Sequence, residues 1–210
     1  MHLTIILYWY SIILLAIANK QEMLENMCKH FDKLLAEYCA PTLLCEKPAC
    51  LVTCLKQRFP NGKDLVSEYN KAFHEKGWAL EILKETDTAY LVLVYHIDLL
   101  TKCISCKRQQ EMLVQEGYAD FSCDECLHCL KQRLNRFDTF PHEIGVFLGY
   151  PVDDILAFKK HNGKNFTCSG YWKVYHNEEQ AKQTFETYNH CRAVLTDKLA
   201  QGEPLLEVLS

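Results

Sequence analysis

Apolar residues recur every three or four positions over seven stretches of the chain, which is the pattern of amphipathic helices. In the first stretch, one stripe carries Met23, Met27, Phe31, Leu34, Leu35 and Tyr38. Gly77 follows the second stretch and suits the end of a helix. The predicted helices are 23–38, 64–76, 98–116, 123–136, 142–149, 152–161 and a last one that begins near Asn177.

Four shorter segments carry the patterns of β-strands. Residues 49–55 (ACLVTCL) are mostly apolar, and residues 78–84 alternate between apolar and polar side chains. Residues 90–95 (YLVLVY) are apolar throughout, as expected for a central strand covered on both faces. Thr86-Asp87-Thr88 predicts a hairpin between these two strands. Residues 170–175 (GYWKVY) form the fourth predicted strand.

Strands and helices in this order indicate an α+β fold. No repeat, low-complexity tract or linker rich in Pro, Gly and Ser interrupts residues 21–210, so this stretch is expected to form a single compact domain. We expect a small mixed or antiparallel sheet of three to four strands, packed by about six to seven helices.

The first 20 residues differ from the rest, because Leu3–Ala18 is almost continuously apolar. The segment is shorter than the roughly 20 residues that span a bilayer as a helix, and no Lys or Arg precedes it as in a signal peptide. Three interpretations stay open. The gene start is placed too far upstream, with the true start at Met23 or Met27; the segment is a membrane anchor or export signal; or it is a packed helix. Membrane contact is expected only if residues 3–18 are genuine.

Charge and cysteine usage narrow the class of protein. The formal net charge is -4 and the basic residues are scattered, whereas nucleic-acid binding requires a basic face, so nucleic acid is not an expected partner. Many of the 12 cysteines lie in apolar periodic segments, where a free thiol behaves as a small hydrophobe. We therefore expect a reducing cytoplasm, with anchoring or export through residues 3–18 as the alternative.

Cys103, Cys106, Cys123 and Cys126 form two CxxC pairs whose spacing matches a four-cysteine zinc site. Both pairs lie in segments predicted as helix. If these helices form an antiparallel hairpin, the rise of 1.5 Å per residue separates the pairs by roughly 15 Å. The metal site therefore competes with the simpler interpretation that these cysteines face a helix interface.

The block from Phe140 to Pro151 carries the most unusual residues of the chain. His142 and Glu143 follow Pro141 at the predicted start of a helix, where a carboxylate complements the helix dipole. Gly145 and Gly149 are four residues apart and would share a helix face that another element or a ligand can approach closely. A capped helix packed tightly by its glycines is the alternative to a binding site.

Three aromatic residues lie close together in the predicted strand that follows. Alternation places Tyr171, Lys173 and Tyr175 on one face of this strand, with Trp172 between them on the other. A lysine between two tyrosines suits an anionic or flat ligand, although its stem would also rest on the aromatic rings of a solvated face.

The chain resembles the DUF3793 family, whose members have no established activity and occur mainly in anaerobic Firmicutes. The similar stretches are FPHEIGVFLGYPVDDILAF (140–158), NGKNFTCSGYWKVY (162–175), Tyr188-x2-Cys191-Arg192 and Cys39-Ala40-Pro41-Thr42-Leu43. Tyr38 stands where the family often has His before this cysteine. The resemblance covers about residues 23–209 and implies a bacterial protein in which residues 1–20 and the CxxC cysteines lie outside the family pattern.

Three functions remain in competition. The first is a cytosolic module that binds a small ligand, cofactor or metal at residues 140–175, with the cofactor itself unknown. A structural or interaction protein with a protein partner and no small-molecule site is the second. The third is an enzyme with Cys39 or Cys168 as nucleophile and His142 as base, with Glu143 beside it.

Overall fold

The computed structural model describes residues 2–136 and 139–209, with side chains for all of these except residues 2–13, 15 and 16. A three-stranded antiparallel sheet lies at the centre, in the order β1-β3-β2. The strands are β1 (Ala49–Leu55), β2 (Trp78–Glu85) and β3 (Ala89–His96). Each was predicted to within two residues, and the turn at residues 86–88 joins β2 to β3 as expected.

The central strand β3 is buried on both faces. Val92 and Val94 contribute to a core on one side of the sheet, and Leu93 contributes to a second core on the other. Successive side chains of a strand point to opposite faces, so an uninterrupted apolar run is what two cores require. The position predicted for residues 90–95 is therefore confirmed.

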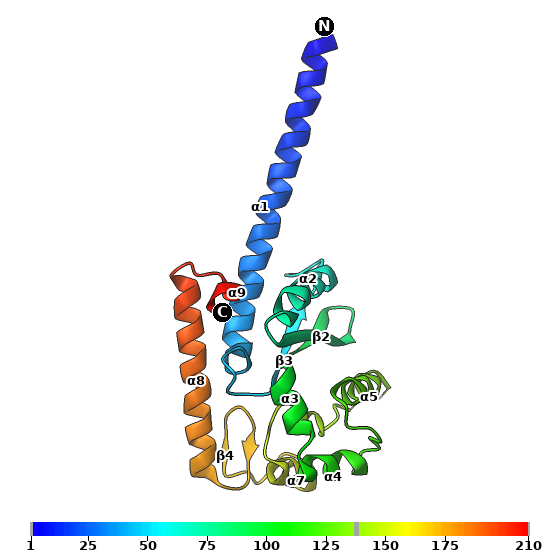
Figure 1. Ribbon diagram of the computed structural model, residues 1–210, viewed down its shortest axis with the longest axis vertical. Coiled ribbons are helices and arrows are strands. Elements are labelled where there is room, and N and C mark those ends of the chain that lie inside the picture. Colours follow the sequence, from blue (N-terminus) through cyan, green and yellow to red (C-terminus); the bar gives the residue numbers. More distant parts are fainter. Residues whose placement is uncertain (1, 137–138, 210) are drawn as a thin grey trace.

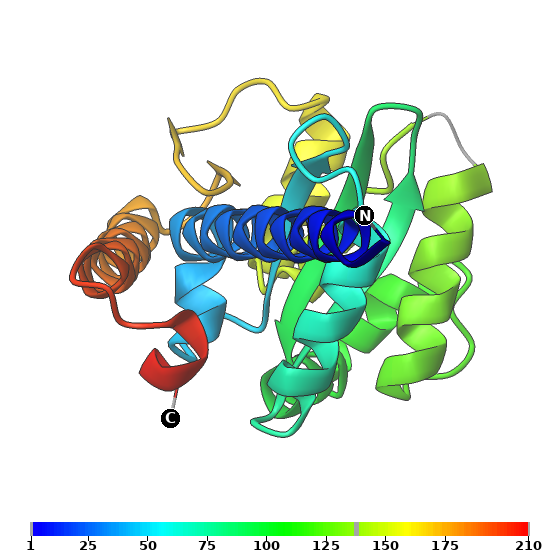
Figure 2. The ribbon, with the colours of Figure 1, turned by 90° about the horizontal axis from the view of Figure 1, so that it is seen from above.

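Helices complete the two cores (Figure 2). The first core is shared by α1 (His2–Leu43), α2 (Gly62–His74), α8 (Glu178–Ala200) and α9 (Leu205–Val208). The second core is shared by α3 (Ile97–Ile104), α4 (Lys107–Gln115), α5 (Cys123–Arg136), α6 (Ile144–Phe147) and α7 (Val152–His161). A two-stranded hairpin, β4 (Cys168–Ser169) with β5 (Lys173–Val174), follows α7. This arrangement confirms the α+β class.

Helix α1 is much longer than the predicted helix 23–38. Its C-terminal part packs against α8, and its N-terminal part extends beyond the rest of the chain (Figure 1). Among the residues that the structure describes, no helix combines the length and the apolar character needed to cross a membrane. The interpretations of residues 1–20 stay predictions.

The single helix predicted over residues 98–116 is wrong, because it breaks between α3 and α4. Cys106 is extended, with φ -70° and ψ 135°, and acts as the N-terminal cap residue of α4. Just before the break, the Ser105 hydroxyl donates to the Thr101 carbonyl at 2.7 Å, and the Thr101 hydroxyl donates to the Ile97 carbonyl at 2.8 Å. Hydroxyl groups that bond the backbone in this way compete with regular helix geometry.

Two further predictions about element length are corrected. The helix predicted over 142–149 is only the single turn of α6, because Gly149 adopts a left-handed conformation with φ +70° and Pro151 follows it. The strand predicted over 170–175 is shortened to β5, and residues 170–172 form the turn of the hairpin.

Asp32 on α1 gives the first testable prediction. Burial raises the pKa of its carboxyl, although the Tyr69 hydroxyl donates a hydrogen bond to it at 2.7 Å. The unfolded chain therefore releases this proton at a lower pH than the native chain, and stability falls as pH rises through that window. We expect Asp32→Asn to be more stable than the natural chain at pH 7. Urea unfolding at pH 7 and pH 3 tests this: the difference should vanish at pH 3, and an equal difference at both values would contradict it.

Candidate functional site

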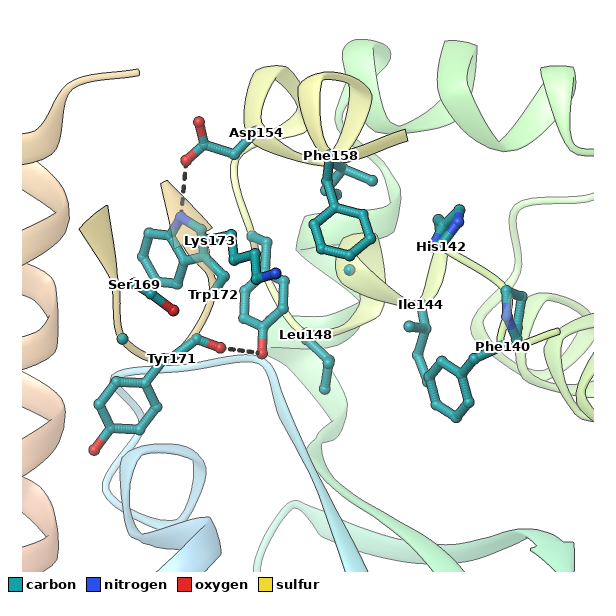
Figure 3. Close-up of a pocket in the computed structure, with 15 residues that line it drawn as sticks. Phe140, His142, Ile144, Leu148, Asp154, Phe158, Ser169, Tyr171, Trp172 and Lys173 are labelled. Carbon is teal, nitrogen blue, oxygen red and sulfur yellow. Dashed lines mark hydrogen bonds between the residues drawn. The ribbon is translucent and has the colours of Figure 1, made fainter. Parts of the chain in front are cut away.

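A cavity of about 390 Å³ lies between α6, α7 and the β4–β5 hairpin. Figure 3 shows its labelled side chains, which come from α7, from the β4–β5 hairpin, and from α6 together with the residues on either side of it. Its apolar wall consists of Phe140, Pro141, Ile144, Leu148, Tyr150, Ile155, Phe158 and Trp172. The remaining lining residues are His142, Gly145, Asp154, Ser169, Gly170, Tyr171 and Lys173. All of them fall within residues 140–175, the segment where the sequence predicts a binding site.

Aromatic rings give the cavity its shape. The Tyr150 and Trp172 rings lie 5.3 Å apart, and Trp172 packs edge-on against Phe185 of α8 at 4.5 Å between centroids. On the opposite side, the His142 ring packs edge-on against Phe158 at 5.3 Å. Aromatic contacts of this kind prefer particular geometries, so they fix the positions of the rings on both sides of the cavity.

Asp154 fixes the hairpin to α7. Its carboxylate is 2% exposed and accepts a hydrogen bond from Trp172 Nε1 at 2.8 Å (Figure 3). It also accepts hydrogen bonds from Tyr175 N at 2.9 Å and His176 N at 3.0 Å. The His176 Nδ1 atom lies 3.2 Å from the same carboxylate. A two-residue strand pair has little stability of its own, so this buried carboxylate determines where the Trp172 ring lies.

Tyr150 connects the hairpin to α6. Its hydroxyl donates to the Tyr171 carbonyl at 2.9 Å (Figure 3). Burial raises the pKa of Tyr150, and the charge of Cys50 raises it further, so the phenol stays neutral and keeps this donor.

Lys173 is the cationic residue on the wall. Its Nζ donates to the Gly163 carbonyl at 2.7 Å and lies 5.6 Å from the centre of the Phe158 ring and 4.9 Å from that of Phe166. An ammonium group has three hydrogen-bond donors. After one hydrogen bond to a carbonyl, Lys173 can still donate to an anionic group of a ligand.

Five of the eight predicted ligand-binding residues line the cavity, namely His142, Gly145, Tyr171, Trp172 and Lys173. Glu143, Gly149 and Tyr175 do not. The Tyr175 ring instead stacks on His161 at 5.7 Å between centroids. Hairpin geometry explains this outcome, because the shortened strand no longer places Tyr171, Lys173 and Tyr175 on one face.

Glu143 is a structural residue of a charge network. It is 1% exposed and accepts a hydrogen bond from Arg133 Nε. Arg133 also donates to the Glu116 carbonyl at 2.7 Å and forms an ion pair with the Glu116 carboxylate at 3.0 Å, and Lys159 pairs with the same carboxylate. This network joins the C-terminal end of α4 and the start of α6 to α5 and α7.

Gly145 and Gly149 do not share a helix face, because α6 ends before Gly149, and the two glycines make different contacts. A side chain at Gly145 would lie 2.9 Å from Ile155 and 3.3 Å from Tyr150, so this glycine lets α6 approach α7. Gly149 lies beyond the helix, and a side chain there would lie 2.6 Å from Pro48. Both glycines therefore allow close packing around the cavity.

Three of the four CxxC cysteines each donate to a different backbone carbonyl. The Cys103 thiol donates to the Val146 carbonyl at 3.4 Å, Cys106 to Lys102 at 3.4 Å, and Cys126 to Asp120 at 3.2 Å. Burial raises the pKa of Cys103 to about 11 and that of Cys126 to about 12, which opposes the thiolate that zinc requires. Within residues 2–136 and 139–209, no three His, Cys, Asp or Glu side chains are grouped so that they could hold a metal ion.

The predicted nucleophiles lie away from the cavity wall. Cys39 is fully buried in the first core, and Cys168 precedes the lining residue Ser169 but does not line the cavity itself. In the part of the chain that the structure describes, no hydrogen bond joins either thiol to His142.

Sequence reasoning missed the other ten lining residues, among them Tyr150, Asp154, Phe158 and Ser169. Asp154 stands in the first turn of a helix, where a carboxylate is explained by the helix dipole alone. The sequence did contain one signal for Asp154. A single carboxylate is enough to complement the helix dipole, so the second one, next to Asp153, was available for a buried role.

Neither a curated protein nor a solved structure matches this chain. One family model does, described as a protein of unknown function (DUF3793), and it matches residues 35–209. The match spans most of the chain and includes every residue that lines the cavity. The chain belongs to the DUF3793 family.

Proposed function

We propose that this protein binds a small, largely apolar molecule with an anionic group in the cavity between α6, α7 and the β4–β5 hairpin. The observation that carries the proposal is the cavity itself, about 390 Å³ with aromatic walls and few polar groups. Binding sites for small molecules have volumes of roughly 300–1,000 Å³ and this type of lining. Lys173 would contact the anionic group, and the Trp172 and Phe158 rings would hold the apolar part.

The probe that tests the proposal is 8-anilinonaphthalene-1-sulfonate, a flat apolar anion. We expect one saturable site on the folded chain, measured by fluorescence titration. Ser169→Trp should weaken binding at least about tenfold, because Ser169 is an exposed wall residue and a large ring there fills the cavity. Glu179→Trp, at an exposed position of α8 outside the wall, is the matched control and should bind as the natural chain does.

The role of Lys173 is tested by comparing this probe with the neutral N-phenyl-1-naphthylamine. Lys173→Met should weaken binding of the anion about tenfold and leave the neutral probe unchanged, because only the anion gains from the ammonium. Binding that survives Ser169→Trp would exclude the cavity as the site. The chain would then be better explained as an interaction protein.

A further inference from the structure

Two buried cysteines meet where α1 passes into β1. Cys39 lies in the last part of α1 and is fully buried, and Cys50 is the second residue of β1 and is 3% exposed. The Thr42 hydroxyl donates a hydrogen bond to the Cys50 sulfur at 3.1 Å, and the Cys39 thiol hydrogen-bonds the same sulfur. Cys50 thus has two donors directed at it within the apolar core.

Lys47, in the loop between α1 and β1, is buried beside this pair. It is 4% exposed, and its Nζ lies 5.2 Å from the centre of the Tyr150 ring and 5.7 Å from that of Tyr188. A buried ammonium group normally has an anionic partner, because leaving a lone charge in the interior is costly. Among the described residues, no carboxylate lies within 4.0 Å of this ammonium group.

Cys50 is the residue near this ammonium group whose surroundings favour a negative charge. The hydrogen bond from Cys39 lowers the pKa of Cys50, and the Lys47 ammonium and the Thr42 hydroxyl lower it further, against the effect of burial. Burial raises the pKa of Cys39 well above its usual range, and the hydrogen bond and charge of Cys50 add to this. These contacts favour the proton on Cys39 and the negative charge on Cys50.

The groups that face the pair from other elements do not compete for this role. Burial and the charge of Cys50 raise the pKa of Tyr188 on α8, so this phenol stays neutral, as Tyr150 does. Burial raises the pKa of Cys54, further along β1, to about 11. The hairpin residue Tyr171 also has a raised pKa, through burial first.

We propose that Cys50 and Cys39 form a reactive dithiol site, in which the Lys47 ammonium and the Thr42 hydroxyl hold Cys50 as the nucleophile for a small hydroperoxide. The Cys50 thiolate attacks one oxygen of hydrogen peroxide and the O–O bond breaks, which gives a sulfenic acid and releases hydroxide. The Cys39 thiol then attacks the Cys50 sulfur. An S–S bond forms, the S–O bond breaks, and the oxygen leaves as water with the thiol proton.

With hydrogen peroxide as the oxidant, the atoms and electrons of the reaction balance. One thiolate, one thiol and one hydrogen peroxide give one disulfide, one water and one hydroxide, so two electrons pass from the sulfurs to the peroxide. Lys47 and Pro48 line a surface hollow of about 300 Å³, but neither Cys39 nor Cys50 lines it. A molecule as small as hydrogen peroxide would reach the two thiols through local opening of the loop between α1 and β1. The proposal does not rest on ligand binding in the cavity described above.

The test is oxidation of the full chain by hydrogen peroxide, followed by denaturation, alkylation and peptide mass spectrometry. We expect a Cys39–Cys50 linked peptide, formed at least about tenfold faster than oxidation of Cys54, since one pKa unit changes the thiolate fraction about tenfold. Cys54 is the internal control, because it lies on the same strand and is 1% exposed.

Two variants distinguish the effect of the Lys47 charge from a general disturbance of the fold. Lys47→Met removes the ammonium group and should slow Cys50 oxidation about tenfold, whereas Cys54→Ser should not change it. Thr42→Val, which removes only the hydroxyl, should also slow the reaction and replaces Lys47→Met if that variant does not fold. Oxidation of Cys50 no faster than that of Cys54, or equal rates in the natural chain and the folded variants, would overturn the proposal.

Discussion

Asp154→Ala is expected to lower the free energy of unfolding by about 3 kcal/mol, which corresponds to roughly 10 °C in melting temperature for a chain of this size. The buried carboxylate accepts hydrogen bonds from the Trp172 indole and from the backbone N–H groups of Tyr175 and His176. Removing it leaves these donors without their acceptor. Thermal unfolding followed by circular dichroism measures the loss.

The neighbouring Asp153 provides a matched control. Its side chain is 49% exposed and pairs with Arg108 on the surface, so Asp153→Ala should cost less than about 1 kcal/mol. Asp154→Ala should also abolish binding of the naphthalenesulfonate probe, because the Trp172 ring loses its anchor. Equal destabilisation by the two variants would show that Asp154 does not hold the hairpin.

Arg133→Met is expected to cost about 3 kcal/mol, because it leaves the carboxylate of Glu143 buried without a cation. The same change removes the hydrogen bond to the Glu116 carbonyl at the end of α4. Denaturant unfolding at neutral pH measures the free energy, and the slope of the transition should stay the same if only stability changes.

Lys131→Met on the same helix is the control for Arg133→Met. Lys131 pairs with Glu81 at 2.9 Å, but both side chains are partly exposed, at 44% and 30%. Surface pairs of this kind contribute roughly 0–1 kcal/mol. If both variants lose the same free energy, the network around Glu143 is not a principal stabilising feature of the second core.

The sequence predicts those parts of the fold that local pattern determines. The uninterrupted apolar run of β3 and the apolar stripe of α8 each predict which side chains are buried. Both elements occupy the predicted positions. The lengths of helices were predicted less well where a single hydrogen bond or backbone conformation ends the helix. The hydroxyl bonds at Thr101 and Ser105 and the left-handed backbone at Gly149 end helices that periodicity alone would continue.

The candidate site was predicted as a segment but not as a set of contacts. His142, Trp172 and Lys173 stood out because their residue types are unusual in that context, and all three line the cavity. Glu143 stood out for the same reason, yet it is buried against Arg133, ten residues earlier in the chain. Such a pairing depends on how α5 packs, which neither spacing nor composition encodes.

Every residue that lines the cavity falls between Phe140 and Lys173, whereas the central sheet is complete by His96. The β4–β5 hairpin has two-residue strands and contributes no residue to either core, so it is suited to open as a unit while the sheet and the helices stay packed. Opening of this kind exchanges the amide hydrogens of the hairpin independently of those of β3, α6 and α7. A molecule thus enters the cavity without unfolding of either core.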